Sequence, residues 1–261
     1  MKCKSDYHIH TWHSDGTMKP TDVVRMYKDD EYDIIAITDH DGVDGIKEAE
    51  IAGEALRIKV IPGIEFGTSY DCDGQELELH ILGYHIDAEN KALTDALCSI
   101  RQQRKARNEK LLAYLNGLGY DLTQDDLLQR QGLTWDTAYV GKPNFARALK
   151  ARGYEVSDLW EVLDSVKREM IPSYEAIELT KGAGGIAVLA HPMKTKGLPP
   201  QDTEDFWTAL EGIIRDLKKH GLGGLECYHP SASEEESLRL VVLAGKYHLH
   251  ITNGSDFHGD K

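Results

Sequence analysis

The chain of 261 residues has no continuous apolar run of about 18 residues, the length a helix needs to cross a membrane. Its first residues also lack the apolar stretch of a secretion signal, so we expect a cytoplasmic protein without a membrane span. Cysteine is scarce, and its four copies are too far apart for a Cys-x-x-Cys metal or redox motif. They are Cys3, Cys72, Cys98 and Cys227. Reduced thiols are the expected state in that compartment.

Positive charge is also scarce, because 30 Lys and Arg residues stand against 44 Asp and Glu residues, a formal net charge of −14. This excess of negative charge argues against broad electrostatic attraction to nucleic acid. Duplex DNA is therefore not an expected partner. Small anions and the ends of short single-stranded RNA remain compatible with this charge if metal ions supply local positive potential.

Short apolar segments alternate with helical ones through most of the chain, which is long enough to bury a sizeable core. Strands are predicted at 6–10, 33–38, 59–66, 76–84, 185–190, 224–228 and 249–253, and helices at 21–31, 42–57, 174–181, 203–220 and 233–246. The alternation predicts an α/β fold with a parallel sheet, and seven strands favour a distorted (β/α)₇ barrel. The turn Asp71-Cys-Asp-Gly74 predicts a local hairpin between the third and fourth strands.

The alternation stops between residues 88 and 172, where helices are predicted at 91–116, 124–130, 143–152 and 157–163. Glycines punctuate this region as helix stops. They are Gly117, Gly119, Gly132 and Gly153. We therefore expect a barrel formed by residues 1–87 and 173–261, and a helical insertion of residues 88–172 that caps the active site.

Nine candidate metal ligands stand where predicted strands give way to loops. An isolated strand histidine is more often structural than a ligand, but His8 and His10 share one face of their strand and form a two-ligand clamp. Burying so many polar groups at strand ends without a function would be costly. Three carboxylates and six imidazoles exceed what one ion needs, so we expect a multinuclear site for Mn²⁺, Fe²⁺ or Zn²⁺ with hydrolytic chemistry. The candidates are His8, His10, Asp15, His40, Glu65, His80, His191, Asp256 and His258.

The order and spacing of these motifs resemble the PHP (polymerase and histidinol phosphatase) family of metal-dependent phosphoesterases. The matching segments are Asp6-Tyr-His-Ile-His10, Thr38-Asp-His40, Ile61-Pro-Gly-Ile-Glu65, Glu78-Leu-His80, Ala190-His-Pro192 and Gly254-Ser-Asp-Phe-His258. Within the family, the chain is most similar to the subgroup of 3′,5′-nucleoside-bisphosphate phosphatases and 5′→3′ exoribonucleases. The resemblance implies an amidohydrolase-like barrel.

The resemblance also implies three divalent metal ions, with Glu65 shared by two of them. The implied ligand sets are His8, His10, Glu65 and Asp256; Asp15, His40 and His258; and Glu65, His80 and His191. A hydroxide bridging two of the ions would attack phosphorus, and no catalytic residue beyond the ligands is assigned.

The other six histidines are expected to have supporting or structural roles. We expect His13 to lie beside the ligands and His250 to be buried behind them. The remaining four, His85, His220, His229 and His248, are expected at the surface or in structural positions.

A basic run, Arg101-Gln-Gln-Arg-Lys-Ala-Arg-Asn-Glu-Lys110, lies in the long predicted helix of the insertion. At 100° per residue, Arg104 points within about 40° of an apolar stripe, whereas Lys105 points away from it. The stripe consists of Leu97, Ile100, Leu111, Leu115 and Leu118. An inward arginine needs an anionic partner, which is either a substrate phosphate or an internal Asp or Glu.

The segment Gly141-Lys-Pro-Asn144 is a second candidate for substrate contacts. Similar sequences in the family carry Gly-Arg-Pro-His there, so Lys142 would meet a phosphate as a point charge without the two-pronged contact of arginine. The full set of predicted substrate-binding residues is Arg101, Arg104, Arg107, Asn108, Lys142 and Asn144.

These observations predict a metal-dependent phosphatase that hydrolyses phosphate monoesters of small metabolites, and a nucleoside 3′,5′-bisphosphate is the favoured substrate. The alternatives within the family are a 5′→3′ exoribonuclease on short RNA and a histidinol-phosphate phosphatase. An alternative of another class is a non-catalytic, metal-stabilised scaffold, which the presence of all nine ligand positions disfavours.

Overall fold

The computed structural model describes residues 3–128 and 139–259. The chain forms two compact units, of which the first comprises Met1–Asp95 and Met170–Lys261 and the second Ala96–Glu169. We call them the barrel unit and the helical unit. The predicted insertion, residues 88–172, begins eight residues before the helical unit and ends three residues after it, and its role as a cap stays a prediction.

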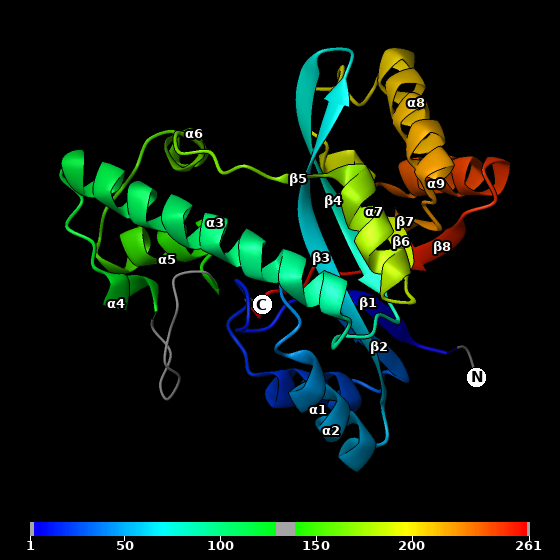
Figure 1. Ribbon diagram of the computed structural model, residues 1–261, viewed down its shortest axis with the longest axis horizontal. Coiled ribbons are helices and arrows are strands. Elements are labelled where there is room, and N and C mark those ends of the chain that lie inside the picture. Colours follow the sequence, from blue (N-terminus) through cyan, green and yellow to red (C-terminus); the bar gives the residue numbers. More distant parts are fainter. Residues whose placement is uncertain (1–2, 129–138, 260–261) are drawn as a thin grey trace. The chain divides into compact units, whose positions relative to one another are not determined.

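The barrel unit contains one nearly closed sheet (Figure 1). Its strands follow the order β1 (Ser5–Ile9), β2 (Ile34–Ile37), β3 (Lys59–Cys72), β4 (Gln75–Tyr84), β6 (Ile186–Leu189), β7 (Gly224–Tyr228) and β8 (His250–Asn253), and β5 (Ile171–Pro172) pairs with β3 beside this path. Between the two ends of the path, Asn253 Nδ2 donates to the Ser5 carbonyl at 2.7 Å. The sequence predicted seven strands and missed β5, because two residues are too short to leave a periodic pattern.

The sheet is mixed rather than parallel throughout. Strands β1, β2 and β3 run parallel, as do β6, β7 and β8, but β4 is antiparallel to both β3 and β6. The predicted hairpin is confirmed: Cys72 pairs with Gln75 across a two-residue turn in which Asp73 and Gly74 both have positive φ, 53° and 86°. This reversal places His80 inside β4, opposite Gly67, and not at a strand end as the sequence had indicated.

Helices cover the outside of this sheet. They are α1 (Pro20–Asp29), α2 (Ile46–Leu56), α7 (Ser173–Gly182), α8 (Glu204–His220) and α9 (Glu234–Lys246), and a 3₁₀ turn, η2, spans Pro192–Lys194. In Figure 1, α1 lies beside β2, α2 beside β3, and α9 beside β7. Local sequence explains the helix limits: α9 begins with a capping box of Ser233 and Glu236, and α8 ends at Gly221 with φ 104°. Apolar side chains of α1, α2 and the first strands form a buried core, including Ile9, Val23, Val24, Ile35 and Ile37.

The helical unit has its own apolar core. Most of α3 (Lys91–Gly117) belongs to it, together with α4 (Gln124–Leu127), α5 (Lys142–Ala151) and α6 (Leu159–Asp164). The core consists of Leu111, Leu115, Leu122, Leu127, Val140, Phe145, Ala148, Leu149 and Leu163. In the described part of this unit there is no strand, which agrees with the loss of strand signals in the sequence.

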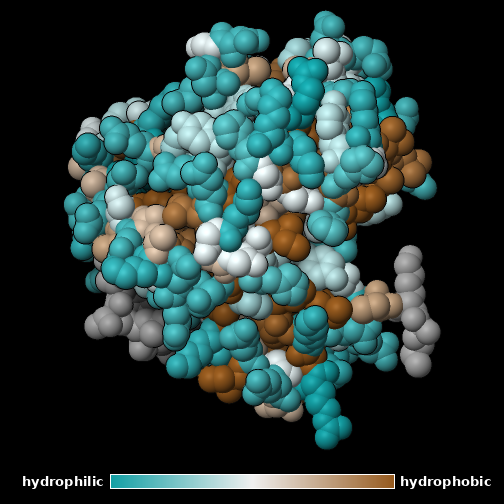
Figure 2. All heavy atoms as spheres, turned by 45° about the vertical axis from the view of Figure 1, so that its right-hand side comes forward, coloured by the Kyte–Doolittle hydropathy of each residue, from teal (hydrophilic) through white to brown (hydrophobic). Residues whose placement is uncertain are grey.

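Polar side chains cover most of the face shown in Figure 2, and apolar ones reach the surface in patches. In the described residues, Val242 and Leu238 of α9 are among the most exposed large apolar side chains. None of the helices in the described ranges combines the length and the apolar character needed to cross a membrane.

Candidate metal centre

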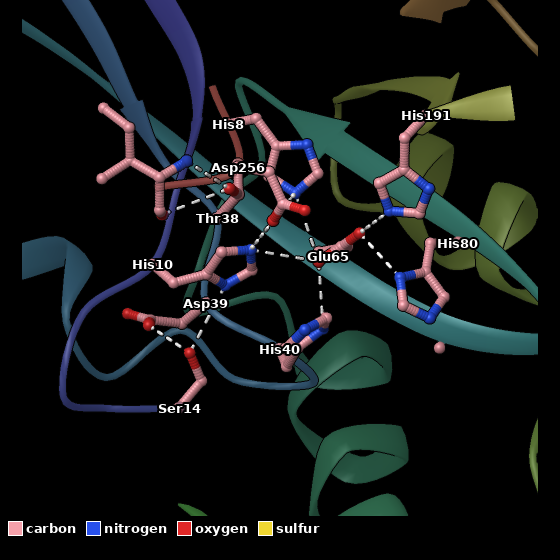
Figure 3. Close-up of polar contacts among 12 residues, drawn as sticks. His8, His10, Ser14, Thr38, Asp39, His40, Glu65, His80, His191 and Asp256 are labelled. Atoms are coloured by element: carbon pink, nitrogen blue, oxygen red, sulfur yellow. Dashed lines mark hydrogen bonds and ion pairs between the residues drawn. The ribbon is translucent and has the colours of Figure 1, made fainter. Parts of the chain in front are cut away.

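The nine predicted ligands come from separate segments of the barrel unit and gather in one cluster. Figure 3 labels all of them except Asp15 and His258. They lie on β1 and the loop after it (His8, His10, Asp15), after β2 (His40), within β3 and β4 (Glu65, His80), after β6 (His191) and after β8 (Asp256, His258). Residues from six of the strands or their following loops thus meet in space, although up to 250 positions separate the first ligand from the last.

Glu65 lies at the centre of the cluster, and its carboxylate is fully buried among five imidazoles. Its Oε2 lies 3.3 Å from His8 Nε2, 3.2 Å from His10 Nε2 and 3.0 Å from His40 Nδ1, and its Oε1 lies 2.8 Å from His80 Nδ1 and 3.0 Å from His191 Nε2. A carboxylate whose two oxygens face different sets of imidazoles has the geometry needed to bridge two ions.

Three overlapping groups have ligand atoms that all lie within 4.8 Å of one another. They are His8, His10, Glu65 and Asp256; His10, Asp15, His40 and His258; and His40, Glu65 and His80. The first group equals a set implied by the resemblance, the second adds His10, and the third contains His40 where His191 had been expected. Because His191 still contacts Glu65 Oε1, the difference concerns how the ligands divide among ions, and that division stays a prediction.

Orphaned polar atoms at the centre of the cluster fit a bound cation. His8 Nε2, His10 Nε2 and Glu65 Oε2 are buried and form no hydrogen bond with the described residues, yet they converge at 3.2 and 3.3 Å. Leaving such atoms unsatisfied costs free energy, which a divalent ion would recover by accepting their lone pairs. Imidazole and carboxylate donors suit Mn²⁺, Fe²⁺ and Zn²⁺.

Burial and the carboxylates have opposing effects on the imidazoles. Burial lowers the pKa of His10, but the neighbouring carboxylates of Asp256 and Glu65 outweigh it and raise that pKa to about 9. Burial likewise lowers the pKa of His80, and Glu65 raises it to about 10. For His191 burial prevails and lowers the pKa to about 4. The metal-free cluster therefore holds protons at His10 and His80 that a metal ion must displace.

Asp256 presents its two oxygens to different neighbours. Oδ1 lies 3.5 Å from His8 Nε2 and 3.3 Å from His10 Nε2, at the centre of the cluster. Oδ2 lies 2.7 Å from Lys194 Nζ and 3.5 Å from His229 Nε2, on the other side. His229 was expected at the surface or in a structural position, but its side chain is only 5% exposed and lies at the edge of the cluster. Neither contact leaves a signal in the sequence, because Lys194 and His229 follow different strands.

Asp39, the middle residue of the Thr-Asp-His segment, fixes the loop after β1. It accepts hydrogen bonds from the Thr11 backbone N at 2.7 Å, from Thr11 Oγ1 at 2.7 Å and from Ser14 Oγ at 2.6 Å. These bonds hold the loop that carries Asp15 against the loop that carries His40. The Thr-Asp-His segment is recognisable in the sequence, but the role of Asp39 in it is not.

Asp6 connects β1 to the segment that carries Asp256. Its Oδ1 accepts hydrogen bonds from the backbone N of His8 at 3.1 Å and of Ser255 at 3.0 Å, and its Oδ2 accepts from Tyr27 Oη at 2.9 Å. The carboxylate thereby brings ligands from the first and last strands into one place. Sequence reasoning missed this role, although Asp6 is an acidic residue in the same predicted strand as His8 and His10.

Two of the predicted ligands have unusual backbone conformations. His191 has a φ of 24° and Asp256 a φ of 55°, values that residues other than glycine rarely adopt. Such strain persists only where surrounding contacts enforce it, and it is concentrated at functional sites.

Three of the remaining histidines lie at the surface, which agrees with their expected positions. His85, His220 and His248 are exposed, and His13 is half-buried. The expectation that His250 is buried behind the ligands was wrong, because its side chain is exposed on β8, where the neighbouring Ile251 also reaches solvent.

The basic run in the helical unit behaves as its helical phase predicted. Arg104, Arg107 and Asn108 are buried, and Lys105 is exposed. Arg104 Nη2 donates to the Val140 carbonyl at 3.4 Å, and Asn108 Nδ2 donates to the same oxygen at 2.8 Å.

Arg101 and Leu118 are less buried than Arg104. Arg101 is half-buried, and its guanidinium lies 5.2 Å from the centre of the Tyr139 ring. Leu118 does not join the apolar stripe and is 51% exposed, because α3 ends one residue before it.

The two candidates of the Gly-Lys-Pro-Asn segment have structural partners within the helical unit. Lys142 Nζ forms an ion pair with Asp164. Asn144 Oδ1 accepts a hydrogen bond from the Gly141 backbone N at 2.9 Å and caps α5. Whether these side chains also bind a substrate stays a prediction.

A barrel that gathers imidazoles and carboxylates in this way is typical of hydrolases that use metal ions. The chain belongs to the PHP domain family, whose sequence model matches residues 6–226. It is a metal-dependent phosphoesterase with a mixed α/β, barrel-like fold, and the family resemblance of its motifs is confirmed.

Known relatives cover nearly the whole chain. It is 29% identical to a 5′-3′ exoribonuclease of Haemophilus influenzae, covering 99% of this chain and 91% of the relative. It is also 29% identical to a 3′,5′-nucleoside bisphosphate phosphatase of Chromobacterium violaceum, covering 97% and 86%. A crystal structure from Bifidobacterium adolescentis, of a protein assigned to the metal-dependent phosphoesterases, matches with a TM-score of 0.82 at 29% identity, covering 99% and 89%.

Proposed function

We propose that this phosphoesterase removes the 3′-phosphate from nucleoside 3′,5′-bisphosphates. The observation that carries its phosphate chemistry is the buried Glu65 carboxylate, which divides its oxygens between two sets of imidazoles. The substrate class is supported by similarity to the Chromobacterium violaceum phosphatase over 97% of the chain. Buried arginines on the helical unit also suit a substrate with a second phosphate.

The chain's own residues would hold three divalent ions, Mn²⁺, Fe²⁺ or Zn²⁺, through the three groups described above. When bound, such ions supply Lewis acidity that activates water and neutralises negative charge on the phosphoryl oxygens. Around them, Glu65 and Asp256 provide negative charge that balances the ions, and the buried imidazoles of His8 and His10 keep water away from the centre. Lys194 places an ammonium group at the edge of the cluster, where an anionic substrate would meet it.

For the second phosphate we propose Arg104, assisted by Arg107 and Asn108. A contact remote from the reacting phosphorus contributes binding free energy that positions the substrate for attack. Arg101, Lys142 and Asn144 would complete this set, and the helical unit would then act as the cap that the sequence predicted.

The test is a comparison of substrates with Mn²⁺ or Zn²⁺ added and the ion-free chelated protein as control. Release of inorganic phosphate is measured from nucleoside 3′,5′-bisphosphates, from nucleoside 5′-monophosphates and from histidinol phosphate. We expect the highest kcat/KM for the bisphosphates, with the 5′-monophosphate as product. Preference for histidinol phosphate, or equal rates for mono- and bisphosphates, would refute the proposed substrate.

A 5′→3′ exoribonuclease is the second candidate, favoured by the similarity to the Haemophilus influenzae enzyme over 99% of this chain. It is distinguished by its products, because an exoribonuclease converts a 5′-phosphorylated oligoribonucleotide into mononucleotides without releasing inorganic phosphate. A non-catalytic scaffold would hydrolyse none of these compounds.

A further inference from the structure

Glu226 lies on β7 behind the metal cluster, and no side-chain atom of it reaches solvent. Its carboxylate accepts two hydrogen bonds from two of the predicted ligands. Oε1 lies 3.0 Å from His8 Nδ1, and Oε2 accepts from the His191 backbone N at 2.7 Å. Neither the motifs nor the metal groups include this residue.

The first contact determines which ring nitrogen of His8 faces the cluster. An ionised carboxylate can only accept, so Nδ1 carries the hydrogen, and in the neutral imidazole that binds a metal the lone pair is on Nε2. That Nε2 atom lies 3.3 Å from Glu65 Oε2 and 3.5 Å from Asp256 Oδ1. A carboxylate behind a ligating imidazole fixes its orientation and increases its basicity toward a metal.

The second contact holds a strained backbone. His191 has a φ of 24°, and the hydrogen bond from its N–H to Glu226 satisfies a buried donor in that conformation. The ring then lies with Nε2 3.0 Å from Glu65 Oε1. One carboxylate thus orients two ligands from distant segments, His8 on β1 and His191 after β6.

Gly254 provides independent evidence that His8 and Glu226 are tightly packed against the backbone. A Cβ atom at this position would lie 2.2 Å from His8 Cβ and 2.3 Å from Glu226 Oε1. Its backbone N donates to the Tyr228 carbonyl at 3.0 Å, which ties the segment after β8 to the end of β7. Only glycine lets the chain pass so close to the pair of His8 and Glu226.

We propose that Glu226 is a positioning residue for the metal ligands His8 and His191, and that Gly254 is glycine because any side chain would separate Glu226 from His8. This inference rests on the proposed metal site but not on the proposed substrate. Glu226 acts through the ligands and does not itself touch the substrate.

The test measures metal affinity without substrate. The full-length chain is stripped of metal and titrated with Zn²⁺ or Mn²⁺ in competition with a chromophoric chelator. In Glu226→Gln the amide offers one oxygen and one NH₂ group, so one of the two N–H donors faces another donor. We expect the affinity for at least one ion to fall by about 10–100-fold. Glu211→Gln, which changes a carboxylate bound to Lys246 and Tyr247 instead, should bind as the wild type does.

A second variant tests the proposal independently in case Glu226→Gln does not fold. Gly254→Ala leaves the chemistry of Glu226 unchanged and should lower metal affinity in the same range. Gly245→Ala is the matched control, because a Cβ there would meet nothing within 4 Å. Circular dichroism checks the fold, and if Glu226→Gln fails to fold, Gly254→Ala decides alone.

Wild-type affinity in a folded Glu226→Gln or Gly254→Ala protein would overturn the proposal, as would a wild-type protein that binds no metal. A wild-type protein that binds metal tightly but hydrolyses no bisphosphate would refute only the proposed substrate. Loss of affinity in both variants, with both controls unchanged, supports the positioning role.

Discussion

The ammonium group of Lys194 lies 2.7 Å from Asp256 Oδ2, on the side of that carboxylate that faces away from His8 and His10. Lys194 belongs to the 3₁₀ turn directly after His191, so the segment that follows β6 brings both an imidazole and a cation to the cluster. Its side chain is 47% exposed, whereas that of Asp256 is 13% exposed. The Lys194 side chain therefore lies between the buried Asp256 carboxylate and the solvent.

We expect Lys194→Met to lower kcat/KM for a phosphomonoester by about tenfold or more, the loss of a hydrogen bond to a charged group. Metal content should stay close to that of the wild type, because Asp256 Oδ1 keeps its place among the imidazoles. Steady-state kinetics and elemental analysis measure the two effects. Lys219→Met removes a comparable exposed pair with Asp216 and serves as the control. Equal kcat/KM in the two variants would show that Lys194 does not meet the substrate.

The metal assignment predicts that the purified protein carries more than one equivalent of transition metal. Asp256→Ala and His40→Ala should each abolish phosphatase activity, because each removes a metal-ligating side chain that alanine cannot replace. Circular dichroism should show that the fold persists. An absence of bound metal in elemental analysis, together with activity that chelators do not change, would favour the scaffold alternative.

Metal affinity should increase with pH. Burial lowers the pKa values of His10 and His80, but neighbouring carboxylates outweigh it and raise them to about 9 and about 10 in the metal-free protein. Below these values a proton occupies each imidazole and competes with the metal ion, so affinity rises as the pH approaches them and levels off above. Titration calorimetry in buffers with different ionisation enthalpies should detect the released protons at neutral pH. An affinity that does not change with pH would contradict these pKa shifts.

The inward direction of Arg104 predicts a selective effect on substrates with two phosphates. Arg104→Ala should raise KM for a nucleoside 3′,5′-bisphosphate. The expected loss of binding free energy is about 1.5–3 kcal/mol, typical of a hydrogen bond to a charged group. A mononucleotide lacks the second phosphate and should respond little. Lys105→Ala is the control, because Lys105 is exposed on the neighbouring position of α3 while Arg104 is 5% exposed.

Thermal unfolding of both variants separates binding from folding, because Arg104 also donates to the Val140 carbonyl. If Arg104→Ala and Lys105→Ala have the same KM values, Arg104 does not bind the second phosphate.

Features that depend on local physics could be predicted from the sequence. The turn at Asp73 and Gly74 sets both φ angles and therefore the hairpin, and the 100° step of a helix turns Arg104 inward. The alternation of side chains on a strand places His8 and His10 on one face. The set of predicted ligands follows from motifs of a few residues each, so it did not depend on knowing the fold.

Contacts between distant segments were decided only by the tertiary structure. The pairing of β5 with β3, the contact of His229 with Asp256 and the exposure of His250 all depend on which strands become neighbours. Glu226 is the clearest case, because its partners His8 and His191 lie 218 and 35 positions away in the chain. The sequence around a carboxylate in a short strand does not indicate which distant residues will contact it. Its role emerges only when the folded sheet buries the charge beside donors from other strands.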